Sequence, residues 1–266
     1  MRIGFLQMRP RFGRPAENVA HILGALARVR DATIVLPELC TTGYVFRSRT
    51  ELESLAEPIT GPSIVALRAL ARRNRLTLCA GIAERAGQRI YNAAATMTPA
   101  GSIAVYRKAH LFDHEKTVFD VAPSRFETVP GARMFGVMIC FDWVFPEVCR
   151  SLALRGAQVI LHPSNLVLPY CQKAMTTRAI ENRIFAVTCN RVGSEARGGV
   201  SLRFTGRSQI VDPRGQVLVR APARGEALCI VRIDPRGARS KQITPRNDLF
   251  TDRRPELYAA LVAPRR

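Results

Sequence analysis

The chain of 266 residues carries a formal net charge of +19 at pH 7, and 47% of its residues are hydrophobic. This apolar fraction supports a substantial core, which excludes a disordered or fibrous chain, and no run approaches the roughly 18 apolar residues that cross a membrane. The positive charge alone would suit a nucleic-acid-binding protein, but arginines are spread over every segment, and no helix-turn-helix, zinc-finger or RNA-recognition pattern accompanies them.

Strand-like and helix-like segments alternate along the chain. Short apolar runs, many of them rich in β-branched residues, predict strands at 2–8, 32–36, 76–83, 90–98, 102–107, 135–140, 157–161, 184–190, 207–211, 216–219 and 227–233. Helices are predicted at 15–30, at 61–75, from near Phe145 to just before Gly156, and at 172–183.

The balance of strands and helices predicts the fold class. Turn sequences at 98–102 and 212–216 place Pro and Gly between apolar runs, so hairpins interrupt the alternation of strands and helices. One parallel sheet would not need so many strands for so few helices. Two mixed β-sheets packed face to face and covered outside by helices would use them all, which predicts an α/β protein with a four-layer αββα sandwich.

The domain organisation follows from the absence of linkers. No low-complexity segment or repeat divides the chain, so we expect a single domain over 1–266. Residues 245–266 form a polar C-terminal tail, and we expect its apolar side chains to contact a neighbouring subunit; these are Leu249, Phe250, Leu257, Tyr258 and Leu261.

Cysteine usage indicates the compartment. The seven cysteines are scattered without close pairs, which argues against a disulfide framework and a zinc ribbon. The first ten residues also lack the charged head and apolar core of a secretion signal. We therefore expect a cytoplasmic protein with reduced cysteines.

Three predicted strands end in residues that carry chemistry. The run 33–36 leads to Glu38, the run 102–107 leads to Lys108 with Glu115 seven residues later, and the run 135–139 leads to Cys140. Ligands of open α/β sheets bind at the carboxyl ends of strands. A base, a cation and a thiol are the parts that acyl transfer through a cysteine requires. Each residue alone also has an ordinary structural interpretation, such as a solvated glutamate or a packed thiol.

The segments "LPELCTTGY", "YRKAHLFDHEK" and "ICFDWVFPE" resemble the three signature blocks of the nitrilase superfamily of carbon–nitrogen hydrolases. The resemblance extends over nearly the whole chain. It implies Glu38 as general base, Lys108 as transition-state stabiliser, Cys140 as nucleophile and Glu115 as a second pocket glutamate. It also implies an αββα fold and a homodimer or larger homo-oligomer.

The same resemblance implies a reaction. Cys140 would attack a small amide, ureide or nitrile, and the oxyanion of an amide or ureide would be held by Lys108 and the backbone N–H of Phe141. We expect Tyr44, Trp143 and Asn165 to bind the substrate, and we expect no cofactor. An amide or ureide is our first choice and a nitrile the alternative.

Other chemistries remain as alternatives. A Cys–His protease pair would need His110, His114 or His162 beside the thiol, and no protease signature surrounds Cys140. His110 and His114 are spaced for a metal pair, but no third ligand is evident, so we expect no metal. A basic nucleic-acid-binding protein without catalysis, or an inactive scaffold, would be the alternatives from other classes.

Overall fold

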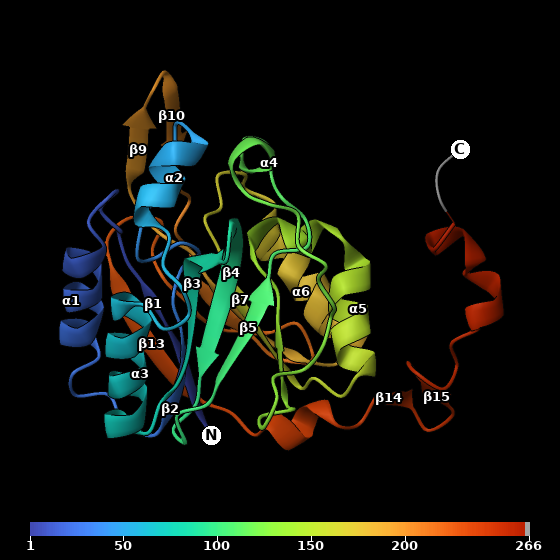
Figure 1. The fold of residues 1–266 in the computed structure, drawn as a ribbon. Helices are drawn as coiled ribbons and strands as arrows, with labels where there is room; N and C mark the ends of the chain where they lie inside the picture. Colours follow the sequence, from blue (N-terminus) through green and yellow to red (C-terminus); the bar gives the residue numbers. More distant parts are fainter. Residues whose placement is uncertain (264–266) are drawn as a thin grey trace.

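The computed structural model describes residues 1–263 (Figure 1). Its first large sheet has the strand order β13-β1-β2-β3-β4-β5. These strands are β1 (Arg2–Gln7), β2 (Ala32–Val35), β3 (Thr77–Ala86), β4 (Arg89–Met97), β5 (Ile103–Arg107) and β13 (Ala227–Arg232). Strands β1, β2 and β3 are parallel, and β4, β5 and β13 pair antiparallel with their neighbours.

The second large sheet has the order β12-β11-β8-β7-β6. Its strands are β6 (Phe135–Val137), β7 (Val159–Pro163), β8 (Phe185–Cys189), β11 (Gln209–Val211) and β12 (Val217–Arg220). Strands β6, β7 and β8 are parallel, and the other two pairs are antiparallel.

Helices cover the outer faces of the two sheets. Helices α1 (Pro15–Ala25) and α3 (Pro62–Asn74) lie beside the first sheet, and α5 (Pro146–Leu154) and α6 (Cys171–Asn182) lie beside the second (Figure 1). This confirms the predicted α/β architecture of two mixed sheets between helices. None of the helices among residues 1–263 combines the length and apolar character needed to span a bilayer.

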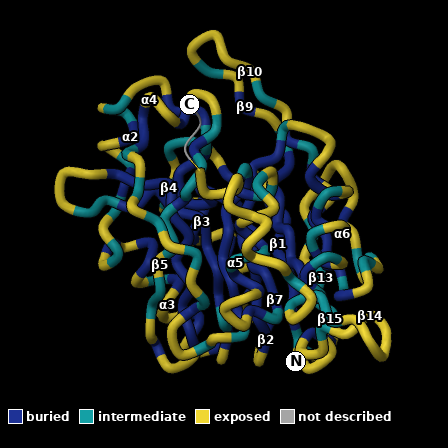
Figure 2. The backbone as a smooth tube through the Cα atoms, turned by 90° about the vertical axis from the view of Figure 1, so that its right-hand side faces the viewer, coloured by how far each residue is buried: buried dark blue, intermediate teal, exposed yellow. Residues whose placement is uncertain are grey.

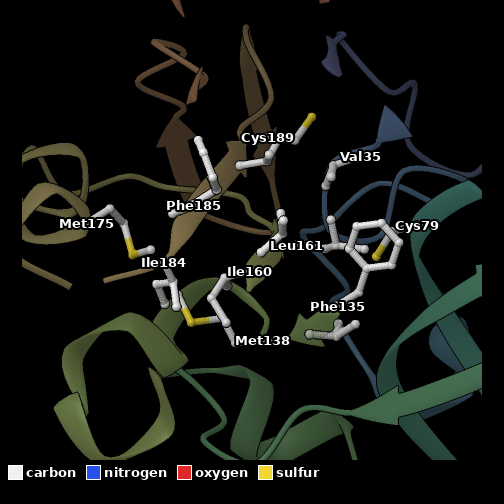
Figure 3. Packing of buried hydrophobic residues seen from close by; sticks show 14 of the residues in the cluster. Val35, Cys79, Phe135, Met138, Ile160, Leu161, Met175, Ile184, Phe185 and Cys189 are labelled. Carbon is white, nitrogen blue, oxygen red and sulfur yellow. The ribbon is translucent and has the colours of Figure 1, made fainter. Parts of the chain in front are cut away.

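The core fills the space between the layers. Figure 3 shows Val35 and Cys79 of the first sheet facing Phe135 and Leu161 of the second. The preceding residue of β7, Ile160, lies with Met175 and Ile184 on the side of α5 and α6 because successive strand residues point to opposite faces. The central strands of both sheets are accordingly buried, while β5, β12 and β13 at the sheet edges are partly exposed and many surface connections are exposed (Figure 2).

Smaller elements complete the fold. They are α2 (Arg49–Leu55), α4 (Glu115–Val118), β9 (Ser194–Arg197), β10 (Val200–Arg203), β14 (Gln242–Thr244), β15 (Asn247–Asp248) and the 3₁₀ helices η1 (Cys140–Val144), η2 (Pro235–Ala238), η3 (Pro255–Leu257) and η4 (Ala259–Leu261). The β9–β10 hairpin projects from the body of the molecule (Figure 1) and turns at Gly198 and Gly199, which both have positive φ.

Two predicted elements end three or more residues before their predicted bounds. The helix predicted over 15–30 ends at Ala25, because the backbone then changes to turns in which the Ala27 N–H donates to the Gly24 carbonyl and the Val29 N–H to the Leu26 carbonyl. The strand predicted over 135–140 ends at Val137, because the backbone turns into η1 and Cys140 adopts a φ of 40°. Leu26 and Val29 lie beyond the end of the helix but are still buried, so the apolar spacing in the sequence continues past the helical segment.

Candidate active site

The four predicted catalytic side chains are buried and come from connections that follow strands. Glu38 follows β2, Lys108 follows β5, Glu115 begins α4, and Cys140 follows β6. Their exposed fractions are 0%, 1%, 4% and 6%, in the same order. Because β2 and β5 belong to the first sheet and β6 to the second, the site lies at the boundary of the two sheets.

The Lys108 ammonium holds the acidic residues together. Its Nζ lies 2.7 Å from Glu38 Oε1 and 2.8 Å from both carboxylate oxygens of Glu115. Burial alone would lower the pKa of Lys108, but the Glu115 and Glu38 carboxylates raise it well above its usual value. Lys108 is therefore a permanent cation at neutral pH.

Glu38 has one occupied and one unoccupied oxygen. Its Oε1 accepts from Lys108 and, at 2.7 Å, from the Asn92 side chain of β4. Its Oε2 has no hydrogen-bond partner among residues 1–263. A buried carboxylate oxygen without a partner is costly, so this atom is available to accept a proton from a neighbouring group.

The Cys140 thiol is kept protonated by its surroundings. Burial raises its pKa well above the usual value, the nearby Glu38 charge adds to this effect, and Lys108 opposes it. A protonated thiol would need a base before its sulfur could act as a nucleophile, in contrast to a cysteine that is already a thiolate. Proton transfer from Cys140 to Glu38 would move a negative charge within the cluster without changing its total.

The backbone at Cys140 is constrained. Its φ of 40° is unusual for a residue with a side chain and marks a strained turn between β6 and η1. The Nε2–H of His162 donates to the Cys140 carbonyl at 3.0 Å, and Nδ1 accepts from Thr188 Oγ1 at 3.1 Å. The Phe141 N–H has no acceptor among residues 1–263.

His162 predicts a loss of stability in acid. Burial lowers its pKa from 6.5 to about 4, so its stabilising contribution is complete above pH 6.5 and is lost as the pH falls toward 4. Between pH 7 and pH 5 this single group should cost about 2 kcal/mol in free energy of unfolding. Urea unfolding of the parent and His162→Gln at both pH values tests this; equal pH dependence in the two proteins would contradict it.

Asp142 fastens the Lys108 loop to the Cys140 turn. It accepts from the Ile139 N–H at 2.9 Å, from Tyr106 Oη of β5 at 2.8 Å, and from the backbone N–H and Nδ1–H of His110 at 3.1 and 2.8 Å. The His110 ring stacks on Phe145 with centroids 3.7 Å apart. One buried carboxylate thus joins the two sheets beside the site.

Tyr44 is bonded to the cluster through Glu115. Its hydroxyl donates to Glu115 Oε1 at 2.7 Å. The N–H groups of Tyr44 and Val45 donate to Glu195 at 3.0 and 2.7 Å, and Glu195 forms an ion pair with the fully buried Arg191. The loop after β2 is therefore held on two sides, by Glu115 through the Tyr44 hydroxyl and by Glu195 through the backbone of Tyr44 and Val45.

We expect Tyr44→Phe to reduce kcat/KM about tenfold, because a hydrogen bond to a charged group is lost and Glu115 no longer holds Lys108 in one position. Initial rates of ammonia release measure the effect. Tyr91→Phe is the matched control, since this buried tyrosine packs under Arg107 instead. Unchanged kinetics of Tyr44→Phe would show that the hydroxyl contributes nothing.

A narrow hollow of about 20 Å³ opens onto the thiol. Its walls are Phe112, Cys140, Phe141, Trp143, Asn165, Leu166, Val167 and Leu168. Of the three predicted substrate-binding residues, Trp143 and Asn165 line the hollow, and Tyr44 lies behind it in contact with Glu115. The volume suffices for about one water molecule, so a substrate would have to displace some of these side chains.

The histidines weighed as metal or protease residues have other partners. His110 binds Asp142, His114 Nε2 donates to the Phe46 carbonyl at 3.0 Å, and His162 binds the Cys140 backbone, not its sulfur. In the part of the chain that the structure describes, no group of three or more His, Cys, Asp or Glu side chains is placed to hold a metal ion.

Several residues that shape the site were missed by the sequence analysis. Asn92, Asp142, Arg191 and Glu195 act through partners far away along the chain. Gly81 on β3 was also missed: a Cβ there would lie 2.4 Å from Glu38 Cα, so only glycine admits the Glu38 turn. An isolated glycine within a strand-like run is a signal of close backbone approach that could have identified it.

Comparisons with known proteins agree with this geometry. The family model for carbon-nitrogen hydrolase matches residues 2–242. The chain is 41% identical to a protein named nitrilase from Pyrococcus abyssi, over 97% of this chain and 99% of that protein. It is 36% identical to an (R)-stereoselective amidase from Pseudomonas sp., over 88% and 85% of the two chains.

A solved structure gives the same answer for the fold. The crystal structure of a carbon-nitrogen hydrolase from Helicobacter pylori G27 superposes with a TM-score of 0.87 at 26% identity and covers 99% of this chain and 98% of that one. The resemblance inferred from the three sequence blocks is thereby confirmed. The chain belongs to the carbon–nitrogen hydrolases of the nitrilase superfamily and is an enzyme of that family.

Proposed function

We propose that the enzyme hydrolyses a small amide or ureide through a thioester on Cys140. The observation that carries the proposal is the unpartnered, buried Glu38 Oε2 in a cluster that also holds the Lys108 ammonium and influences the Cys140 thiol. A free carboxylate oxygen, a fixed cation and a protonated thiol are what base-assisted attack by sulfur requires.

The first half of the reaction forms the thioester. Glu38 accepts the thiol proton as Cys140 Sγ bonds to the carbonyl carbon, and the oxyanion is held by Lys108 and the Phe141 N–H. The ammonium has three N–H groups and contacts three carboxylate oxygens, one of Glu38 and two of Glu115, so the oxyanion takes the place of one Glu115 oxygen while the other keeps its bond. Glu38 then protonates the departing nitrogen, the carbon–nitrogen bond breaks, and ammonia leaves.

The second half restores the enzyme. Water attacks the thioester, Glu38 takes its proton, and collapse of the tetrahedral intermediate breaks the carbon–sulfur bond. The thiolate recovers the proton from Glu38, and the carboxylic acid leaves. Glu115 keeps its role of orienting Lys108, and Trp143 and Asn165 bind the substrate beside the thiol, with Tyr44 acting through Glu115.

A nitrile is the second candidate substrate, favoured by the name of the Pyrococcus abyssi relative. Other relatives favour amides and ureides: one is named citrullinase, from Francisella tularensis, at 33% identity. A nitrile would yield the same thioester only after one extra addition of water and would develop negative charge on nitrogen.

The test is ammonia release from small amides, ureides and nitriles by the parent and by Cys140→Ala. We expect release by the parent alone and, with a slowly deacylating amide, a mass increase on Cys140 equal to the acyl group. Release that persists in Cys140→Ala would exclude the thioester. Release from nitriles but not from amides or ureides would favour the second candidate.

We also propose that the C-terminal tail contacts a second subunit. The tail extends away from the body of the molecule (Figure 1), and the exposed fractions of Leu257 and Leu261 are 62% and 64%. Of the predicted tail, 264–266 lie outside the described residues. Burying two such leucines favours association, so Leu257→Asp with Leu261→Asp should shift the enzyme to smaller assemblies in light scattering; an unchanged mass would contradict this.

We further propose that the enzyme works in the cytoplasm. Six of its cysteines are buried thiols, a state that a reducing compartment preserves.

A further inference from the structure

The walls of the hollow at Cys140 are almost entirely apolar. Apart from Cys140 itself, the eight lining residues within the described range 1–263 offer only the Asn165 amide and the indole N–H of the otherwise apolar Trp143 as polar side-chain groups. The three charged members of the cluster, Glu38, Lys108 and Glu115, lie behind the thiol and are at most 4% exposed. A substrate that enters the hollow therefore meets hydrocarbon on nearly every side.

The mouth of the hollow continues this apolar character. Leu168 lines the hollow and is 44% exposed, and the neighbouring Tyr170 is 62% exposed. The cation Arg178 donates to the backbone carbonyls of Trp143 and Val144 and forms an ion pair with Glu181. Its charge is thus already used by other groups, so Arg178 does not offer a free counter-ion to a charged substituent on the substrate.

Asn165 is the exception in this apolar wall. It is 2% exposed, and neither its Nδ2 nor its Oδ1 has a hydrogen-bond partner among residues 1–263. A buried amide with both a donor and an acceptor unused is unfavourable unless a ligand supplies the complement. A carboxamide has this complement, because it also carries one kind of donor and one acceptor.

We propose that the hollow selects primary amides whose acyl chain is uncharged and apolar, with Asn165 hydrogen-bonded to the carboxamide. The inference rests on the proposed function and adds the substrate class. Each methylene of such a chain leaves water for an apolar wall, whereas a carboxylate or ammonium would lose its hydration without gaining a partner. The overall charge of +19 therefore says nothing about the pocket, and carbamoyl amino acids are disfavoured.

Three primary amides of equal chain length test the selection. In valeramide the chain ends in a methyl group, in glutaramate in a carboxylate, and in 4-aminobutanamide in an ammonium. We expect kcat/KM for valeramide to exceed that for either charged amide by at least about tenfold. Hydrolysis of a charged amide as efficiently as valeramide would overturn the inference and leave the thioester mechanism intact.

A substitution at the mouth gives an independent check. Leu168→Arg should raise kcat/KM for glutaramate relative to valeramide by about tenfold, because it supplies the missing counter-ion. Leu154→Arg is the matched control: Leu154 is 42% exposed, close to the 44% of Leu168, but lies on α5 and does not line the hollow. A ratio that changes equally in both variants would overturn the assignment of Leu168.

A labelling experiment separates failure of this inference from failure of the proposed function. Iodoacetamide and iodoacetate both alkylate sulfur with loss of iodide, and their rates at Cys140, followed by peptide mass spectrometry, are compared with those at free cysteine. We expect at least a tenfold additional preference of Cys140 for the neutral reagent. If none of the amides is hydrolysed, the proposed function fails; the labelling preference then still supports the apolar selection when present and overturns it when absent.

Discussion

Replacement of Lys108 by arginine is expected to lower kcat by about 100-fold or more, although the positive charge is retained. Lys108 is 1% exposed and bonds to two carboxylates at 2.7 and 2.8 Å, so there is no room for a longer, planar guanidinium. Arginine would displace Glu38 or Glu115 and would direct its N–H groups away from the oxyanion. Overpacking of this kind also costs roughly 1–3 kcal/mol in stability.

Steady-state kinetics with an amide, together with thermal unfolding, distinguish the two effects. A fall in kcat at a temperature where the variant is fully folded assigns the loss to the site. Lys241→Arg is the matched control, because Lys241 is a half-buried lysine that bonds to the carbonyls of Asn182, Arg183 and Ala238 outside the site. A Lys108→Arg enzyme that retains most of its turnover would refute the role assigned to the compact ammonium.

The second large effect is expected from Glu38→Gln, which should reduce kcat by roughly 10²–10⁴-fold. The amide oxygen of glutamine can still accept from Lys108 and Asn92, which preserves the fold of the loop. Glutamine cannot, however, take the thiol proton. Because burial, the largest cause of the raised pKa of Cys140, is still present in this variant, the fraction of thiolate at neutral pH is small.

The pH dependence of the variant provides the decisive measurement. Residual turnover of Glu38→Gln should rise with pH as hydroxide ionises the Cys140 thiol. Turnover of the parent should not depend on this ionisation, because Glu38 takes the thiol proton during the attack. Glu84→Gln is the control for loss of a buried glutamate, since Glu84 is 4% exposed and pairs with Arg107 at 2.7 Å. Parent-like activity of Glu38→Gln near neutral pH would show that another group is the base.

The sequence was informative where local pattern and chemistry coincide. Glu38, Lys108 and Cys140 each follow an apolar run, and the end of such a run is detectable without knowledge of the fold. Helices α3 and α6 begin and end within a residue of their predicted bounds, because their apolar periodicity and flanking signals agree. Helix α1 was predicted too long because buried residues continue past the last helical hydrogen bond.

Other parts of the site depend on pairings that no local pattern encodes. Asn92 lies in β4 and reaches Glu38 only because β2, β3 and β4 are adjacent. Its carbonyl also accepts from the Lys108 N–H, after the neighbouring β5, at 2.8 Å. The contacts of Asp142 with Tyr106 and His110 cross between the sheets. Such contacts follow from how the layers pack. The sequence predicted that the layers exist, but not which residues meet across them.

The division of the site between two sheets has a consequence for refolding. The proposed base, Glu38, and the proposed cation, Lys108, are attached to one sheet and the Cys140 thiol to the other, so neither sheet alone contains all three side chains. After dilution from denaturant, circular dichroism can recover as soon as each sheet forms, whereas the proposed hydrolysis has to wait until the layers dock. The rate at which hydrolysis recovers would thus report the rate at which the two sheets dock.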